Sequence, residues 1–496
     1  MKTDTIAAIA TGMNPSGISI IRVSGDDAVS IVDKIFIGKD KKHHLKNVKT
    51  HTIHYGYILN HPYDIADQKT DDPADSIQMQ SGLYEIIDEV LVSVMLSPNS
   101  YTTEDVVEIN CHGGIAITNR VLDEVLKAGA RMAEPGEFTK RAFLHGRIDL
   151  SQAEAVMDLI DAKSKAAAIN SEKQLQGYLK DSIEKLRNGI MHETAFIEAA
   201  LDDPEHFDLT EYPDTLQTII KDVISDIDKL LQSADDGMLI KEGIRTVILG
   251  KPNVGKSTLL NLLLGQEKAI VTDIPGTTRD ILEQSLSISG IPFVVLDTAG
   301  LRDTDDVVEK IGVEKAKESA KSSDLVLYVV DSSEGFDEED LTTIRSLLQD
   351  QKKTIILLNK SDLNQDNQVR DKIESIYQFI HDEISGNESE IIPVISISAK
   401  ENQGIEEFKN TVKKMFFSGK LDHENEFCIT NTRHKDALYS AKNSLLLVLE
   451  SIRNEMSEDL YMVDLMDAYS QLGTIIGKEV QDDLVETIFS KFCVGK

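Results

Sequence analysis

An eight-residue motif near the middle of the chain constrains the fold most strongly. Residues 250–257 read GKPNVGKS and fit the pattern GxxxxGK[ST]. The motif follows a β-branched run, IRTVIL, and precedes an apolar run, STLLNLLL, which is the strand–loop–helix context of a phosphate-binding loop. Gly250 and Gly255 let backbone N–H groups turn towards phosphates, and the helix N-terminus adds positive potential. The motif therefore predicts a strand, a phosphate-binding loop and a helix in direct succession.

The pattern on either side of the motif predicts an inserted domain. Between residues 241 and 417, short β-branched runs alternate with amphipathic stretches, which is typical of a mostly parallel, doubly wound sheet. Residues 149–240 and 418–496 read as long helices, because apolar residues recur at helical spacing. Residues 1–148 contain the strand and helix runs of an α+β domain. We therefore expect an α/β domain inserted into a helical domain and preceded by an α+β domain.

Charge and cysteine content exclude several classes of protein. The chain of 496 residues has 85 Asp and Glu against 52 Lys and Arg, a formal net charge of −33. This argues against a broad nucleic-acid-binding face, so any RNA contact needs a local basic patch or a partner's surface. Its 3 cysteines show no CxxC spacing, which argues against a cysteine-ligated zinc site or a disulfide framework. Without a secretory leader or a long apolar run, we expect a cytoplasmic protein that does not span a membrane.

Three further motifs follow the phosphate loop in chain order. DTAG begins at Asp297, NKSD spans residues 359–362, and SAK spans residues 398–400, each after a β-branched run. Asp362 can accept hydrogen bonds from the N1–H and exocyclic amine of guanine, a pattern that adenine does not offer. Together with the phosphate loop, these motifs predict a GTPase.

Each motif has an expected role at the nucleotide. Lys256 would reach the terminal phosphates, Ser257 and Thr278 would ligate Mg²⁺ through their hydroxyls, and Asp297 would hold the metal through water. Gly300 would meet the γ-phosphate. The residues expected to contact GTP are Asn253, Val254, Gly255, Lys256, Ser257, Thr258, Thr272, Asp273, Ile274, Pro275, Gly276, Thr277, Thr278, Asp297, Thr298, Ala299, Gly300, Asn359, Lys360, Asp362, Ser398, Ala399 and Lys400.

The residue after DTAG raises the question of how hydrolysis is promoted. Ras-like GTPases place a water-orienting Gln there, whereas this chain has Leu301, which has no hydrogen-bonding group. Asn253 can instead hold a monovalent cation beside the β,γ-bridge, where it would stabilise developing charge as an arginine finger does. Glu309 can polarise the attacking water through a second water, although an exposed carboxylate at a helix start is the simpler interpretation of that residue.

Several motifs lie outside the GTPase set: IRVSG at 21–25, SYTTED at 100–105, EINCHGG at 108–114, PGEFT at 135–139, DLSQAE at 149–154 and FCVGK at 492–496. With these motifs, the chain resembles the MnmE (TrmE) family of tRNA modification GTPases over essentially its whole length. The resemblance implies a P-loop GTPase domain inserted into a helical domain, behind a folate-binding-like domain.

The resemblance implies activation by K⁺ and gives Glu309 a role. The family's K⁺ ligands match Asn253 together with Thr272, Ile274 and Thr277, the last three through oxygens of the kind that any backbone provides. Its catalytic carboxylate matches Glu309. The resemblance also implies a homodimer through the N-terminal domains, with K⁺-dependent pairing of the GTPase domains across the nucleotides.

The resemblance further implies that the N-terminal domain binds 5-formyltetrahydrofolate or a related folate. The matching positions are Arg22, Glu108, Arg147 and Lys496. Guanidinium groups suit a glutamyl carboxylate, and a carboxylate suits the amino-pyrimidine edge of a pterin. Cys493 is the family's C-terminal cysteine and a candidate catalytic thiol, with a frayed chain end as the alternative.

In the family, a FAD-containing partner, MnmG, acts with the GTPase on certain tRNAs. The pair installs an aminomethyl or carboxymethylaminomethyl group at C5 of the wobble uridine, so the acidic chain would rely on its partner for basic tRNA-binding surface. The alternative is a regulatory or ribosome-assembly GTPase switch. Such switches often carry a basic RNA-binding appendix, whereas the C-terminal block here is acidic and helical.

Overall fold

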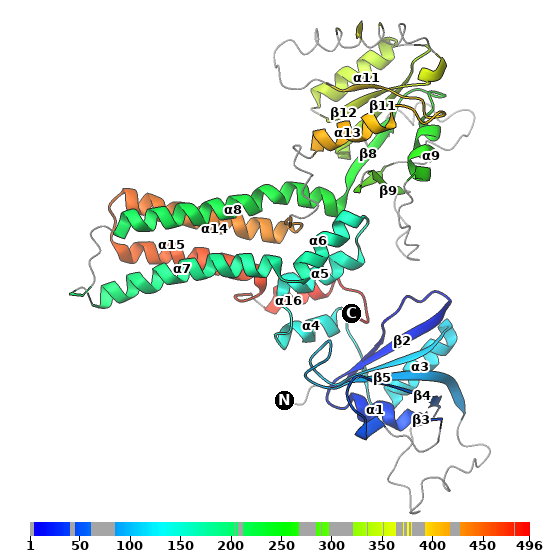
Figure 1. The fold of residues 1–496 in the computed structure, drawn as a ribbon, viewed down its shortest axis with the longest axis vertical. Helices are drawn as coiled ribbons and strands as arrows, with labels where there is room; N and C mark the ends of the chain where they lie inside the picture. The colour runs from blue at the N-terminus through cyan, green and yellow to red at the C-terminus, as the bar shows by residue number, and fades with distance from the viewer. Residues whose placement is uncertain are drawn as a thin grey trace, which may run out of the picture. The chain divides into compact units, whose positions relative to one another are not determined.

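The computed structural model divides the chain into two compact units, drawn in Figure 1. One comprises Met1–Met157 with Gly473–Lys496, and the other comprises Asp158–Leu472. The domain boundaries expected near residues 148, 240 and 417 stay predictions. The structure describes residues 4–39, 45–60, 85–203, 205–206, 212–266, 284–288, 290–296, 321–334, 336–350, 352–363, 371, 374–375, 378, 392–416, 427–480 and 482–496.

A seven-stranded sheet forms the body of the first unit, in the order β3-β4-β5-β6-β2-β1-β7 among the described residues. Its neighbours pair antiparallel, except that β1 and β7 run parallel. The strands are β1 (Ile6–Ile9), β2 (Ser16–Ser24), β3 (Phe36–Gly38), β4 (Thr52–Leu59), β5 (Ile86–Met95), β6 (Val106–Gly113) and β7 (Arg131–Met132).

The two faces of this sheet differ. Helices α1 (Ala28–Ile35) and α3 (Ile115–Lys127) pack against the sheet, and their apolar residues join those of the strands in one core. Alternate strand residues point away from this core, as the pleat requires. Among them Ile53, Tyr55 and Leu91 are exposed, and Tyr55 lies directly opposite Leu91 on the neighbouring strand. Within the part of the chain that the structure describes, these side chains form an exposed apolar patch on the sheet.

The C-terminal segment completes the first unit. Its apolar residues pack with the helices that follow the sheet, around a cluster that includes Phe489 and Phe492. Gly136 and Gly495 both have positive φ, and a Cβ on either would clash with backbone, that of Phe489 and of Ile9 respectively. The helices of this region are α4 (Glu137–Leu144), α5 (Leu150–Ile160) and α16 (Asp482–Phe489).

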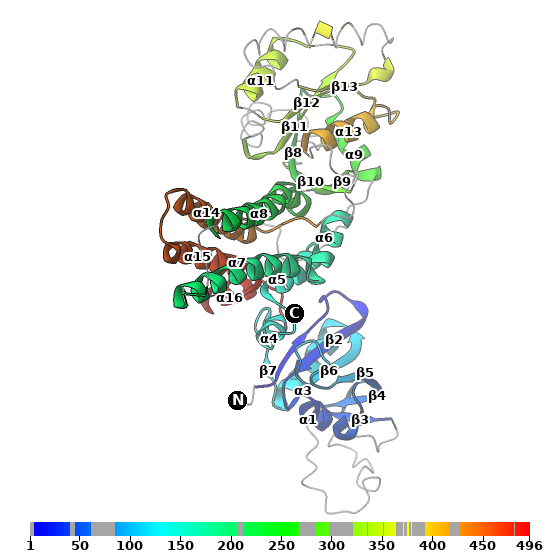
Figure 2. The same cartoon turned by 60° about the vertical axis from the view of Figure 1, so that its left-hand side comes forward.

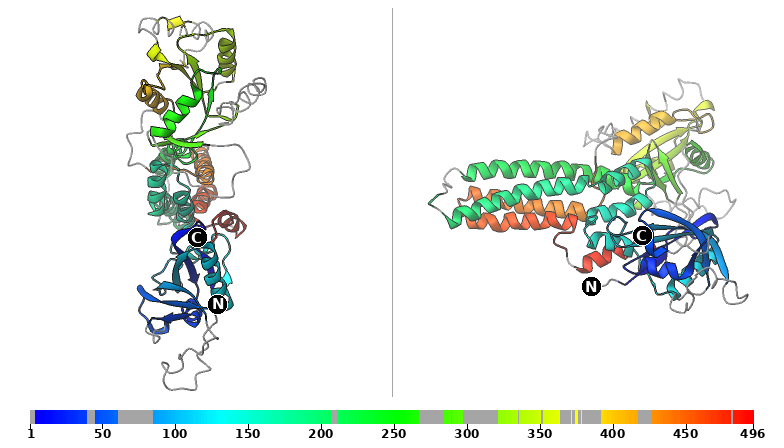
Figure 3. Two further views of the ribbon diagram at one scale, coloured as in Figure 1. Left: turned by 90° about the vertical axis from the view of Figure 1, so that its right-hand side faces the viewer. Right: turned by 60° about the horizontal axis from the view of Figure 1, so that its bottom comes forward.

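The second unit contains a group of long helices and a sheet. The helices α7, α8, α14 and α15 lie side by side in the views of Figures 1 and 3. Apolar residues at helical spacing bury one face of each; on α7 they include Ile183, Leu186 and Ile190. The helices are α6 (Lys165–Leu175), α7 (Tyr178–Asp202), α8 (Tyr212–Glu242), α14 (Thr432–Arg453) and α15 (Glu458–Ile476).

A six-stranded sheet forms the second part of this unit, in the order β13-β12-β11-β8-β10-β9 among the described residues. All pairs are parallel except β10 with β9, and separate apolar clusters cover its two faces, with helices on both (Figure 2). The predicted doubly wound, mostly parallel sheet is therefore confirmed. Its elements are β8 (Ile244–Leu249), α9 (Lys256–Gln266), β9 (Gln284–Ile288), β10 (Ile291–Val295), β11 (Leu325–Asp331), α11 (Glu338–Gln349), β12 (Thr354–Asn359), β13 (Val394–Ser396) and α13 (Ile405–Phe416).

Candidate functional site

The phosphate loop joins the end of β8 to the start of α9, as the motif predicts. Gly250 and Gly255 have φ of 140° and 98°, and Asn253 has φ of 62°, all in the left-handed region. A Cβ at Gly250 would clash with the carbonyl oxygen of Val329, and one at Gly255 would clash with the Asn359 side chain. Both glycines are therefore required by close approach as well as by backbone conformation.

Lys256 folds back over the loop that precedes it. Its Nζ donates to the carbonyl oxygens of Gly250 at 2.7 Å and Lys251 at 2.6 Å. Burial lowers the pKa of Lys256, because desolvation disfavours the charged form. A phosphate bound at the start of α9 would offset that cost, and the hydroxyl of Ser257 in the same turn is of the kind that ligates Mg²⁺. The residues present thus fit an anionic phosphate chain with its metal.

Asn359, the first residue of NKSD, ties the phosphate loop to the SAK segment. Its Nδ2 donates to the carbonyl oxygen of Val254 at 2.8 Å, and its Oδ1 accepts from the backbone N–H of Ala399 at 3.0 Å. Because β8 and β12 are parallel strands of one sheet, their carboxyl ends lie at the same edge. The amide therefore joins three segments that are far apart in sequence into one nucleotide-binding edge.

The carboxylate of Asp362, which is expected to read guanine, is oriented by a neighbouring hydroxyl. Ser398 Oγ donates to Asp362 Oδ1 at 2.6 Å. In turn, Ser398 Oγ accepts from the backbone N–H of Glu401 at 3.1 Å, which fixes the direction in which the hydroxyl donates. A carboxylate held in this way can accept from the N1–H and amine of guanine.

Lys360 bridges the same edge to β11. Its Nζ pairs with Asp331 Oδ2 at 2.6 Å, at the end of that strand. Burial opposes ionisation of Asp331, but hydrogen bonds from Lys360 and Ser333 outweigh it and lower the pKa of the carboxyl. The ion pair thus links the NKSD segment to the end of β11, and Lys360 itself has a left-handed φ of 62°.

Several expected nucleotide residues lie outside the described residues. They include the expected K⁺-binding loop, the second Mg²⁺ hydroxyl, the DTAG motif and the expected catalytic carboxylate. Of the expected K⁺ ligands, the structure describes Asn253. The expected residues outside the described part are Thr272, Asp273, Ile274, Pro275, Gly276, Thr277, Thr278, Asp297, Thr298, Ala299, Gly300 and Glu309.

A second cluster in the first unit contains the expected folate residues. Arg22 and Glu108 are cross-strand neighbours on β2 and β6, and Arg22 Nε donates to Glu108 Oε1 at 2.9 Å. The guanidinium carbons of Arg22 and Arg147 lie 5.4 Å and 4.6 Å from the centre of the Tyr101 ring, so one aromatic side chain supports both cations. Sequence reasoning missed Tyr101, whose signal is its place in the SYTTED motif.

The C-terminal residues reach this cluster. Arg22 Nη1 donates to the carbonyl oxygen of Gly495 at 3.4 Å. Burial and the charge of Arg22 lower the pKa of Lys496, because two cations lie close together here. An anionic ligand would reduce the repulsion between them. The carbonyl oxygen of Cys493 accepts from the backbone N–H of Gly136 at 3.3 Å, and its thiol is exposed. The residues thus fit a ligand carrying carboxylates, and the tail is held rather than frayed.

A phosphate loop at the carboxyl edge of a parallel sheet, joined to the NKSD and SAK segments, is the arrangement of a P-loop GTPase. Residues 5–147 match the family model described as the GTP-binding protein TrmE N-terminus, and residues 150–493 match the MnmE helical domain. The chain is 49% identical over 496 residues to the tRNA modification GTPase MnmE of Lachnoclostridium phytofermentans, covering 100% of both chains. The chain therefore belongs to the MnmE (TrmE) family and is a GTPase of tRNA modification.

A second relative carries the same name. The tRNA modification GTPase MnmE of Thermoanaerobacter pseudethanolicus is 46% identical over 499 residues and is covered over 100% of both chains. Among solved structures, Aquifex aeolicus Era bound to GDP·AlF₄⁻ is 28% identical, with 41% of this chain and 67% of that chain covered and a TM-score of 0.27. In the described part of the chain, no helix is both long and apolar enough to cross a membrane.

Proposed function

We propose that this GTPase is K⁺-dependent and works in the cytoplasm with a FAD-containing partner of the MnmG type. Together they would add an aminomethyl or carboxymethylaminomethyl group to C5 of the wobble uridine of certain tRNAs. The observation that carries the GTPase part is the Asn359 amide, which joins the phosphate loop to the segment that orients Asp362. Membership of the MnmE family supports the tRNA part.

The chain's own residues divide the work of hydrolysis. Lys256 and the N–H groups of its loop bind the phosphates, while Ser257 and Thr278 hold Mg²⁺ and Asp362 selects guanine. Bound K⁺ and Mg²⁺ supply positive charge where negative charge develops between the β- and γ-phosphates. Asn253 offers an amide oxygen to K⁺, with oxygens of Thr272, Ile274 and Thr277 completing the site, and Glu309 polarises the attacking water. The remaining contacts to GTP are those expected from the motifs above.

Monovalent cation identity tests this mechanism. Replacing K⁺ by Na⁺ should reduce turnover by about 10³-fold, the lower end of what an arginine finger contributes, while leaving nucleotide affinity nearly intact. Asn253→Gly keeps the left-handed backbone and removes the amide, so it should abolish the response to K⁺. Asn402→Gly, at another left-handed asparagine of the same domain with φ of 56°, is the matched control. Equal turnover in both salts would contradict the mechanism.

The assignment of Glu309 has a separate test. Glu309→Ala should slow hydrolysis strongly without altering GTP binding, since a water-polarising group acts after the nucleotide is bound. A near-normal rate would remove the role proposed for this carboxylate.

The first unit would bind the folate and form the homodimer. Arg22, Arg147 and Lys496 provide cations for the folate carboxylates, and Glu108 accepts from the amino-pyrimidine edge. For Cys493, the exposed thiol at the same site is consistent with a catalytic role. The exposed patch of Ile53, Tyr55 and Leu91 supports pairing with a second copy through the sheet.

Loss of the modified nucleoside tests the cellular role. In a strain that lacks this chain, total tRNA should lack the C5-modified wobble uridine, and wild-type chain should restore it. An unchanged nucleoside with accumulating ribosome precursors would instead support the ribosome-assembly switch.

A further inference from the structure

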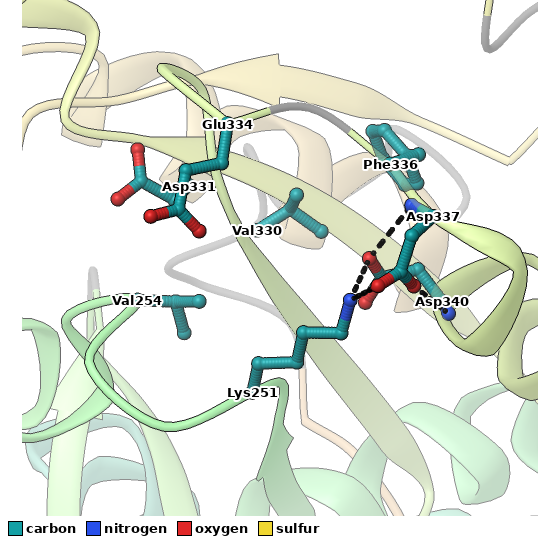
Figure 4. Close-up of a pocket in the computed structure, with 8 residues that line it drawn as sticks. All are labelled: Lys251, Val254, Val330, Asp331, Glu334, Phe336, Asp337 and Asp340. Atoms are coloured by element: carbon teal, nitrogen blue, oxygen red, sulfur yellow. Dashed lines mark hydrogen bonds and ion pairs between the residues drawn. The ribbon is translucent and has the colours of Figure 1, made fainter.

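One side chain of the phosphate loop reaches away from the expected nucleotide contacts. Lys251, the residue after Gly250, extends towards the start of α11 in Figure 4. Its Nζ pairs with Asp337 and lies 2.9 Å from Asp340 Oδ2. These groups line a cavity of about 110 Å³ that also includes Asp331 and further acidic and apolar side chains. The loop is therefore anchored by an ion pair to a helix that follows it by more than eighty residues.

Asp340 is the hub of this anchor. The residue is only 2% exposed, and its Oδ1 accepts from the Tyr328 hydroxyl of β11 at 2.7 Å. Asp337 and Asp340 also cap α11 reciprocally, since Asp337 N donates to Asp340 Oδ2 at 3.2 Å and Asp340 N donates to Asp337 Oδ1 at 3.1 Å. One buried carboxylate thus joins a strand, a helix start and the phosphate loop. Removing its cationic partner would leave it poorly compensated.

A second anchor holds the other side of the turn. Asn359 binds the carbonyl oxygen of Val254, as described above. Pro252 and Asn253 lie between the two anchors, and Asn253 has the left-handed φ of 62°, which is unfavourable for a residue with a Cβ. Pro252 fixes only its own φ, so it does not by itself hold Asn253 in the left-handed conformation. The conformation of the turn therefore depends on contacts at both sides.

We propose that Lys251 and Asp340 are positioning residues for GTP binding: their ion pair holds the phosphate loop in its nucleotide-accepting conformation. Neither residue is expected to touch the nucleotide, and they act through the turn at Asn253 and the N–H groups that follow it. The Lys251 ammonium group contacts the carboxylates of both Asp337 and Asp340, so it offsets the repulsion between these two neighbouring negative charges. The hydrogen bond from Tyr328 aims the Asp340 carboxylate towards the ammonium group.

Substitutions that change charge but preserve shape provide the test. Lys251→Met keeps the aliphatic stem, Asp340→Asn keeps a side-chain oxygen for the helix cap, and Lys251→Arg retains the cation. Lys353→Met, at an exposed lysine before β12 in the same domain, is the control. For each full-length variant, the dissociation rate of a fluorescent GDP analogue, KM and kcat for GTP, and thermal unfolding without nucleotide are measured.

The expected result is a change in binding more than in chemistry. Lys251→Met and Asp340→Asn should each release the GDP analogue about tenfold faster and raise KM, with a smaller change in kcat. The double variant should resemble Lys251→Met, because that substitution already removes the pair with Asp340 together with the pair with Asp337, and Lys251→Arg should retain most of the binding. These readouts do not involve the choice of K⁺ or Na⁺, so they remain informative if the proposed K⁺ dependence fails.

A purely structural role gives a different outcome. In that case, Lys251→Met lowers the unfolding temperature while leaving the dissociation rate and KM at wild-type values, and this result overturns the proposal. Additive effects in the double variant overturn it as well, since they place the two side chains in independent interactions.

Discussion

The nucleotide site and the arginine cluster of the first unit are constructed differently. Four contiguous motifs predict the first, and among the described residues the contacts that order it run largely to backbone atoms: the carbonyls under Lys256, the Val254 carbonyl and the Ala399 N–H. The second depends on side-chain pairs between residues 86 apart, Arg22 and Glu108, and on a contact between residues 473 apart, Arg22 and Gly495. A site ordered by backbone contacts within local motifs can form wherever those motifs occur. A site made of side chains far apart in sequence forms only when the whole unit is folded.

The largest effect is expected for Asp362, the carboxylate proposed to read the base in the contiguous site. Asp362→Asn replaces an acceptor by a donor facing guanine, so GTP affinity should fall at least about 100-fold, while xanthosine triphosphate should gain affinity. Asp350→Asn, at an exposed aspartate of the same domain, is the control. Unchanged discrimination between the two nucleotides would show that NKSD does not read the base here.

The corresponding change in the dispersed site is expected to be smaller. Arg22→Ala should weaken 5-formyltetrahydrofolate binding by about tenfold or more, since it removes a cation and leaves Glu108 unpaired. GTP turnover should be unchanged. Arg120→Ala, which breaks the exposed pair with Glu85, controls for loss of charge. Equal folate affinity in calorimetry for Arg22→Ala and wild type would argue against the assignment.

The aromatic support beneath the arginines is expected to matter less than either arginine. Tyr101→Leu removes the ring shared by Arg22 and Arg147, so folate affinity should fall by a few-fold, consistent with about 1 kcal/mol for partly exposed cation–π contacts. Tyr101→Phe keeps the ring and loses only the hydroxyl contact with Thr139 Oγ1 at 2.9 Å. It should therefore bind folate almost as wild type does. A loss in the Phe variant as large as in the Leu variant would assign the effect to the hydroxyl.

The smallest expected effect is on the pH dependence of stability, through the ion pair between Asp331 and Lys360. The pKa of Asp331 is lowered in the folded protein, so its ion pair with Lys360 contributes stability above the ordinary value of 3.8, and that contribution is lost as pH falls through the folded pKa. Asp331→Asn should cost less than ~1 kcal/mol near neutral pH and converge with wild type in strong acid. Urea unfolding of the second unit from pH 7 down to about pH 2, below the folded pKa of Asp331, measures this convergence. A constant difference across that range would exclude the ion pair as its cause.

The difference between local motifs and contacts distant in sequence also explains which parts of the fold the sequence predicts. Alternating β-branched and amphipathic runs predicted the parallel sheet, and GKPNVGKS placed its loop between β8 and α9, because period and glycine positions are local properties. The grouping of Gly473–Lys496 with the first unit was not predicted. It depends on backbone packing at Gly136 and Gly495, which leaves no periodic signal.

The same reason explains the missed side chains. Tyr101 was part of a motif, yet its position beneath two arginines follows from strand pairing and the path of the chain after α4. Lys251 occupies a variable position of the phosphate-loop pattern, so its partner Asp340 becomes visible only when α11 is placed beside the loop. Local sequence patterns predict which residues are candidates for a functional site. Tertiary contacts determine which of these residues lie close enough to act together.

The packing of Gly495 beneath Ile9 has a consequence for synthesis. Because ribosomes make the polypeptide from its N-terminus, β1 and β2 emerge more than 400 residues before the segment that covers them. The helices and the inserted GTPase unit can fold during that interval, while the arginine cluster waits for its last contributor. The arginine cluster is therefore completed only after the last residues of the chain are made, and premature termination near residue 473 would yield a protein with a GTPase domain but an unfinished first unit.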